Sequence, residues 1–82
     1  MTDLLHKIRA ITAREIVGAL QRDGFQLVRH KGSHHRYTHQ DGRRVTVSFS
    51  APSDTFLRKT LRSMVEKQAR WKDEDLERLK LV

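Results

Sequence analysis

Apolar residues follow a helical spacing in the first third of the chain and a strand spacing in the middle third. A capping box is available at Thr12, which can accept from the amide of Glu15 while the Glu15 side chain reaches back to the amide of Thr12. An apolar stripe of helical spacing follows: Ile16, Val17 and Leu20. Gly24 can adopt the positive φ that often ends a helix. The pattern predicts a helix over residues 13–23, preceded by an N-terminal arm over residues 1–11.

Two segments after this helix alternate well enough to predict strands. Residues 25–30 form the first strand, with Phe25 and Leu27 facing inward. Residues 31–33 form the turn. Residues 34–39 form the second strand, whose inward side chains are His35, Tyr37 and His39. Its outward side chains are His34, Arg36 and Thr38.

The cleanest alternation in the chain is over residues 43–50. Its apolar members all point one way: Val45, Val47 and Phe49. Asp41-Gly42, the strongest short signal for a hairpin turn, comes just before it. The pattern predicts a third strand, antiparallel to the second.

An amphipathic helix is predicted after the loop that contains the only proline, Pro52. Its inward positions are Leu57, Leu61, Met64, Val65 and Gln68. Its start is open between an early cap at Ser53 or Asp54 and a late cap at Thr60. Asp73 is expected to cap a short terminal helix. Two leucines of that helix face inward: Leu76 and Leu79.

The order of elements is therefore α-β-β-β-α followed by a short helix, which predicts an α+β fold. Three antiparallel strands form one sheet, and the helices cover one of its faces. The other face is left for water or a ligand. It is expected to carry His34, Arg36, Arg44 and Thr46.

Length and composition limit the possible classes of protein. The 82 residues are enough for one domain. The absence of cysteine excludes disulfides, a thiolate zinc site and a cysteine nucleophile. No apolar run approaches a membrane span, and charged residues interrupt the first eleven positions. We therefore expect no membrane segment, no secretory signal and a cytoplasmic location.

The charge of the chain points to a polyanion as partner. The formal net charge is +7, and residues 25–72 hold more than the whole excess, with eleven basic and three acidic side chains. Four of the five histidines lie in the same stretch. A basic surface with no ligand is the plainer interpretation, but charge and histidine content together favour nucleic-acid binding.

The histidines favour proton transfer over metal binding. His34 and His35 are neighbours on a predicted strand and face opposite sides, so they cannot readily share an ion, and we expect no metal site and no cofactor. RNA carries its own nucleophile, the 2′-OH, whose proton a histidine can take while Lys and Arg hold the phosphate. Gly32 would let a ligand backbone come close, and Ser33 adds a small donor. Periodicity alone favours the interpretation of His34 as an ordinary surface histidine of a basic protein.

An ordered set of short motifs resembles the HicA family of bacterial toxins, also called YcfA-like. These motifs are Gly24-Phe25, Leu27-Val28-Arg29, the run from Lys31 to Tyr37, the run from Asp41 to Val47, and Thr60-Leu61-Arg62-Ser63-Met64. The similarity extends from about Thr12 to Gln68. The run GFQLVRHKGSHHRY ahead of DGRRVTV is specific as a set, whereas Gly-Ser-His alone would be weak.

The resemblance implies a fold like that of the double-stranded-RNA-binding domain. It also implies an mRNA interferase that cleaves RNA and arrests translation, a catalytic histidine at His34, and a HicB-type antitoxin as partner. Many family members have a proline and a histidine after the third strand, where this chain has Ser48-Phe49-Ser50. That difference leaves His34 as the one candidate for catalysis. A strand register shifted by one residue would exchange the roles of His34 and His35.

The sequence as a whole predicts a metal-independent ribonuclease toxin over residues 12–72, with residues 73–82 as a short C-terminal helix. His34 acts as general base or acid, and five residues contact RNA: Lys31, Gly32, Ser33, Arg36 and Arg44. The free toxin is expected to be a monomer that forms a hetero-oligomer with its antitoxin. The main alternative is a non-catalytic RNA-binding module of the same fold. A third is a protein-interaction domain whose basic face binds only an acidic antitoxin.

Overall fold

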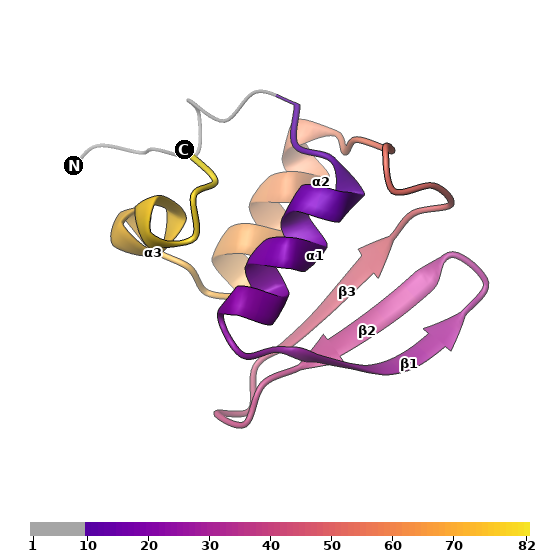
Figure 1. Cartoon of the computed structure of the whole chain (residues 1–82), viewed down its shortest axis with the longest axis horizontal. Coiled ribbons are helices and arrows are strands. Elements are labelled where there is room, and N and C mark those ends of the chain that lie inside the picture. The colour runs from indigo at the N-terminus through magenta and orange to yellow at the C-terminus, as the bar shows by residue number, and fades with distance from the viewer. Residues whose placement is uncertain (1–9) are drawn as a thin grey trace.

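The computed structural model describes residues 10–82, so most of the predicted N-terminal arm lies outside the described residues. The chain has the predicted α+β order (Figure 1). Its elements are α1 (Ala13–Arg22), β1 (Gln26–Lys31), β2 (His34–Thr38), β3 (Arg44–Ser48), α2 (Arg58–Arg62), the π-helix η2 (Ser63–Gln68) that continues α2, and α3 (Asp73–Arg78).

The predicted capping box opens α1. The amide of Glu15 donates to Oγ1 of Thr12 at 3.2 Å, and the amide of Thr12 donates to Oε1 of Glu15 at 3.0 Å. The two bonds satisfy two amides that the first helical turn leaves without intrahelical partners. The helix ends as predicted before Gly24, whose φ is +101°.

The sheet has the order β1-β2-β3, and both pairs are antiparallel. The register between β2 and β3 is regular. The register between β1 and β2 shifts between Leu27 and Arg29, so Val28 is an extra residue at a β-bulge. A bulge reverses the alternation along a strand, and this one decides which face of the sheet Arg29 occupies.

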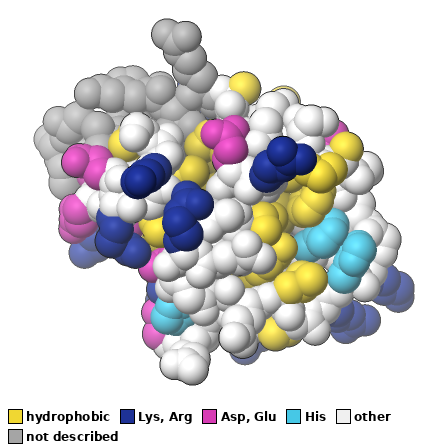
Figure 2. Space-filling view, in the orientation of Figure 1, with side chains coloured by type: hydrophobic (Ala, Val, Ile, Leu, Met, Phe, Trp, Pro, Cys, Tyr) yellow, Lys and Arg dark blue, Asp and Glu magenta, His cyan; other side chains and the backbone are white. Residues whose placement is uncertain are grey.

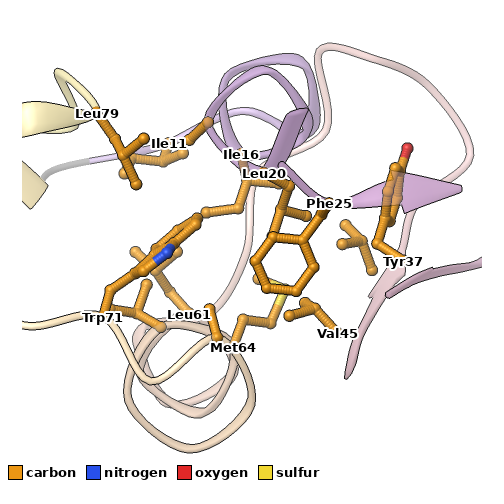
Figure 3. Close-up of a cluster of buried hydrophobic side chains, with 14 of the residues drawn as sticks. Ile11, Ile16, Leu20, Phe25, Tyr37, Val45, Leu61, Met64, Trp71 and Leu79 are labelled. Carbon is orange, nitrogen blue, oxygen red and sulfur yellow. The ribbon is translucent and has the colours of Figure 1, made fainter. Parts of the chain in front are cut away.

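The core lies between the sheet and the helices, which lie on one side of the strands (Figure 1). Its side chains come from every helix, from β2 and β3 and from the segments beside them, but not from β1: Ile11, Ile16, Ala19, Leu20, Phe25, Tyr37, Val45, Val47, Leu61, Met64, Val65, Ala69, Trp71, Leu76 and Leu79. Figure 3 shows the rings of Phe25 and Trp71 close together in this cluster. Their centroids are 6.5 Å apart, with the edge of one toward the face of the other.

Leu27 has the predicted inward orientation, but its side chain is not buried. Leu27 is directly opposite Tyr37, so it faces the helix side of the sheet, but it is 48% exposed. All six residues of β1 are exposed because this strand forms the edge of the sheet. The apolar alternation of the segment therefore gave the orientation of Leu27 and not its burial.

The predicted start of the second helix is wrong. α2 begins after Leu57, which is 79% exposed and not part of the core. The carboxylate of Asp54 accepts from the amides of Ser50 and Ala51, so it closes the loop and does not cap the helix. Thr60 lies inside α2. The helix start has no side-chain cap, because the residue at that position is a leucine.

The C-terminal helix packs into the same core as the sheet-covering helices. Leu76 and Leu79 are buried, as predicted. The cap residue of α3 is Lys72 rather than Asp73, and the Lys72 amide donates to the Asp75 carboxylate at 2.9 Å. No helix among residues 10–82 is long and apolar enough to cross a membrane.

Candidate functional site

His34 lies at the start of β2 with an exposed side chain on the face that the helices leave open. Its cross-strand partners are Lys31 on β1 and Ser48 on β3. Residues directly opposite each other on neighbouring strands point to the same face, so these three side chains form one row across the sheet.

A second row lies two residues further along β2 on the same face. Arg36 on β2 is opposite Arg29 on β1 and Thr46 on β3. The two rows surround a shallow hollow of about 410 Å³. Its lining residues are Arg29, Lys31, Gly32, His34, Arg36 and Thr46.

The structure thus brings together four of the predicted site residues, namely Lys31, Gly32, His34 and Arg36, and it separates the other two. Ser33 is half-buried in the turn, with its Oγ 3.5 Å from that of Ser48. Arg44 is opposite Thr38, further along the open face.

The hollow is built to attract an anion. Three of its lining residues are cationic and none is a carboxylate. Gly32 has a φ of +59°, and a Cβ added there would meet no atom within 4 Å. The turn therefore leaves open space beside the cations, where a phosphate could approach the backbone.

His35 is placed quite differently from His34. Its residue is only 9% exposed, and its ring lies on the helix side of the sheet opposite Val47. Nδ1 lies 3.0 Å from the carbonyl oxygen of Ser33 and 3.3 Å from that of Val47. Both neighbours are acceptors, so Nδ1 carries the proton. The strand register is therefore the predicted one, with His34 facing out and His35 facing in.

Arg29 and His30 are site features that the sequence analysis missed. Strict alternation puts Arg29 on the same face as Leu27, but the bulge at Val28 moves Arg29 to the open face. His30 is opposite His35, and their rings are stacked with centroids 4.1 Å apart. Figure 2 shows histidine side chains beside hydrophobic ones on the visible face of the molecule. No regular pattern in the sequence signals the bulge.

The carboxylate of Asp23 lies at the other end of the sheet, away from the hollow, where it has several partners. The Asp23 carboxylate accepts from Nε1 of Trp71 and from Nη2 of Arg78, each at 2.8 Å. It also lies 3.1 Å from Nη1 of Arg43. Burial alone would raise the pKa of Asp23, but these hydrogen bonds and the Arg43 charge outweigh it and hold that pKa below its ordinary value.

Histidine and carboxylate side chains do not gather into a metal site in the described residues. No group of three or more of them between residues 10 and 82 is placed to hold an ion. Several candidate ligands in this part of the chain have other partners. Nε2 of His39, for example, donates to the Asp23 carbonyl at 2.8 Å.

Helices on one face of a three-stranded antiparallel sheet, with a basic hollow on the other face, define a small α+β protein of the double-stranded-RNA-binding-domain type. The family model described as HicA toxin of bacterial toxin–antitoxin systems matches residues 13–71. The chain therefore belongs to the HicA toxin family, and it is a toxin of a toxin–antitoxin system. A comparison with curated protein sequences finds no match.

Proposed function

We propose that this toxin is an mRNA interferase that cleaves RNA with His34 as its proton-transfer group. The observation that carries the proposal is the position of His34 in a hollow that presents Arg29, Lys31 and Arg36 and no carboxylate. Toxins of this family are ribonucleases, which agrees with the proposal. The reaction takes place in the cytoplasm and needs no metal ion.

In this mechanism an RNA phosphate occupies the hollow. His34 accepts the proton of the 2′-OH, and the 2′-oxygen attacks the adjacent phosphorus. The bond to the 5′-oxygen breaks, that oxygen takes up a proton, and a 2′,3′-cyclic phosphate remains. The three cations stabilise the charge that develops on the phosphate oxygens. Gly32 allows close approach, while Ser33 supports the turn.

Arg44 contacts RNA outside the hollow. It lies on the same face of the sheet, one row beyond Arg36 and Thr46. A neighbouring phosphate of the same strand would reach it. We assign it to binding rather than to the chemical step.

The test is cleavage of a single-stranded RNA by the purified protein, with and without EDTA. We expect wild-type cleavage to survive EDTA and to leave a 2′,3′-cyclic phosphate. His34→Ala should reduce the rate at least a hundredfold, in line with the usual contribution of a general base. Gln40→Ala, in the exposed turn at the other end of β2, is the matched control and should cleave normally.

Two other outcomes would overturn the enzymatic proposal. Binding of RNA without cleavage by the wild type would make the protein an RNA-binding module of the same fold. No affinity for RNA even at low salt would make the basic face a site for an acidic protein alone. A HicB-type antitoxin is the proposed partner in each case, covering the hollow of a toxin that is monomeric when free.

A further inference from the structure

Three aromatic rings form a continuous stack on the helix side of the sheet. Phe49 follows β3, His35 is on β2 and His30 is on β1. The centroids of Phe49 and His35 are 4.0 Å apart with their planes 9° from parallel, and those of His35 and His30 are 4.1 Å apart at 21°. The stack runs across the strands, in the order of the strands in the sheet.

The stack is held in place from both the core and the turn. Phe49 packs against the hydrophobic core, and its amide donates to the Ser33 carbonyl at 2.9 Å. Nδ1 of His35 also donates to that carbonyl. Nε2 of His30 lies 2.8 Å from the Gly32 carbonyl oxygen, to which it donates. The His30 ring is therefore already oriented before any ligand binds.

The outer end of the stack is open in the described part of the chain. His30 is exposed although His35 covers one face of its ring. β1 is the edge of the sheet, so the next position in the stack lies where a fourth strand would be. A flat ring could occupy that position at ordinary stacking distance.

We propose that the exposed face of His30 binds an unpaired nucleobase of the RNA substrate by stacking. The inference rests on the proposed function and adds a base-binding position to it. The surroundings favour a base that belongs to a polyanion, because Arg29 and Lys31 flank His30 along β1 and their side chains line the hollow on the other face. The RNA strand passes around the edge of β1, with a phosphate beside His34 and a base on His30.

His34 and His30 would bind different parts of the same nucleotide chain. The rows that contain His34 and His30 are consecutive along the hairpin of β1 and β2, about 3.4 Å apart along the strand. One row faces the phosphate and the other faces the base. Every base has a flat face, so this stacking position selects unpaired RNA rather than one sequence.

The test uses 2′-O-methyl uridine hexamers, which lack the nucleophile and stay intact, with one 2-aminopurine at each position in turn. We expect the wild-type protein to quench the emission of one position at pH 8. His30→Phe should preserve the quenching. His30→Ala should abolish it and weaken binding on the order of tenfold. Gln26→Ala, exposed on the same strand, is the matched control and should behave as wild type.

A second measurement separates stacking from a general loss of fold or charge. Replacing the quenched base by an abasic site should weaken wild-type binding as much as His30→Ala does, and it should weaken the variant no further. Equal quenching by wild type and His30→Ala would overturn the proposal and assign His30 to a protein contact or to the fold alone. That result would leave the cleavage test untouched, whereas loss of RNA binding by the wild type would overturn both proposals.

Discussion

The glycines at the two ends of β1 meet different constraints. Gly32 has a φ of +59°, within the left-handed region, and open space where a Cβ would stand. Gly24 has a φ of +101°, and a Cβ there would lie 3.0 Å from Nε2 of His39. That nitrogen donates to the carbonyl of Asp23, so it cannot move aside without losing a hydrogen bond.

Alanine should therefore cost more stability at position 24 than at position 32. We expect Gly32→Ala to lower the free energy of unfolding by about 1 kcal/mol, the usual cost of a left-handed residue with a Cβ. Gly24→Ala should cost about 3 kcal/mol, from backbone strain and displacement of His39 together. Urea denaturation followed by circular dichroism measures both, and equal losses would contradict this account.

Asp23 should make stability depend on pH. Because its pKa is lowered by folding, the stability it contributes is fully present above its ordinary pKa of 3.8 and is lost as the pH falls through the lower folded value. Asp23→Asn should cost about 2 kcal/mol at pH 7, because the amide has one acceptor oxygen and can keep only one of the hydrogen bonds from Trp71 and Arg78, and Arg43 loses its anionic partner.

The difference between wild type and Asp23→Asn should shrink as the pH falls below about 4. Denaturant unfolding at a series of pH values, followed by circular dichroism, measures it. Glu74→Gln, exposed on α3, provides a control whose stability should follow that of the wild type. A difference that stays constant down to pH 2 would show that the Asp23 charge is not responsible.

At the scale of elements, η2 supplies a hydrogen-bond partner to β3, the strand at one edge of the sheet. The π-helical stretch closes with the amide of Ala69 donating to the carbonyl of Met64 and that of Trp71 to the carbonyl of Val65. Gln68, at the end of η2, accepts from the amide of Thr46 on β3 at 2.9 Å. A side chain therefore takes the place of a neighbouring strand.

Gln68→Ala should leave the Thr46 amide without this partner. We expect a loss of about 1 kcal/mol in the free energy of unfolding and faster hydrogen exchange at that amide. Gln68→Glu keeps an acceptor oxygen and should retain most of the protection. Exchange at Thr46 that is unchanged in Gln68→Ala would show that the bond contributes nothing to the edge.

The sequence was sufficient to predict the strands in which buried apolar residues alternate with exposed polar ones. β2 and β3 were predicted with the correct faces, because Tyr37, Val45 and Val47 alternate with polar residues and are all buried. β1 was predicted less well because a bulge reverses its alternation at Val28, and the bulge depends on pairing with β2 rather than on local sequence. The start of α2 at Arg58 was missed because the apolar spacing of the helix continues to Leu57, which lies in the exposed loop.

The difference between local pattern and strand pairing also explains which residues of the candidate site could be predicted from the sequence. The faces of His34 and Arg36 follow from the alternation of β2. The hollow also needs Arg29, whose face depends on the bulge, and the ring stack needs residues that only the fold brings together. The alternation of residues along one strand does not predict which side chains of three neighbouring strands lie side by side across the sheet.

At the scale of the whole molecule, charge should govern the affinity for RNA. The net charge is +7, and three of the cations that contribute to it line the hollow. If RNA phosphates bind there, the logarithm of the association constant falls linearly with the logarithm of the salt concentration. Lys31→Ala should reduce the magnitude of that slope by about 0.7, the value for one phosphate contact with a single strand.

Fluorescence anisotropy of a labelled, uncleavable RNA over a range of salt concentrations measures the slope. Lys67→Ala removes the same charge from an exposed position on η2 that does not line the hollow, and it should leave the slope nearly unchanged. If both substitutions changed the slope equally, the overall charge and not the hollow would determine binding.

The two edges of the sheet differ in how open they are to pairing with a strand of another molecule. η2 packs against β3 and fills a backbone position there, whereas β1 has no neighbouring strand in the described part of the chain. A sheet with two open edges can recruit copies of itself without limit and grow into a fibre. A sheet with one open edge completes its pairing when two chains have met. The Gln68 side chain occupies one backbone amide of β3 and so makes that edge less available to a second strand, while the like charges of Arg29 and Lys31 disfavour pairing of two copies along β1.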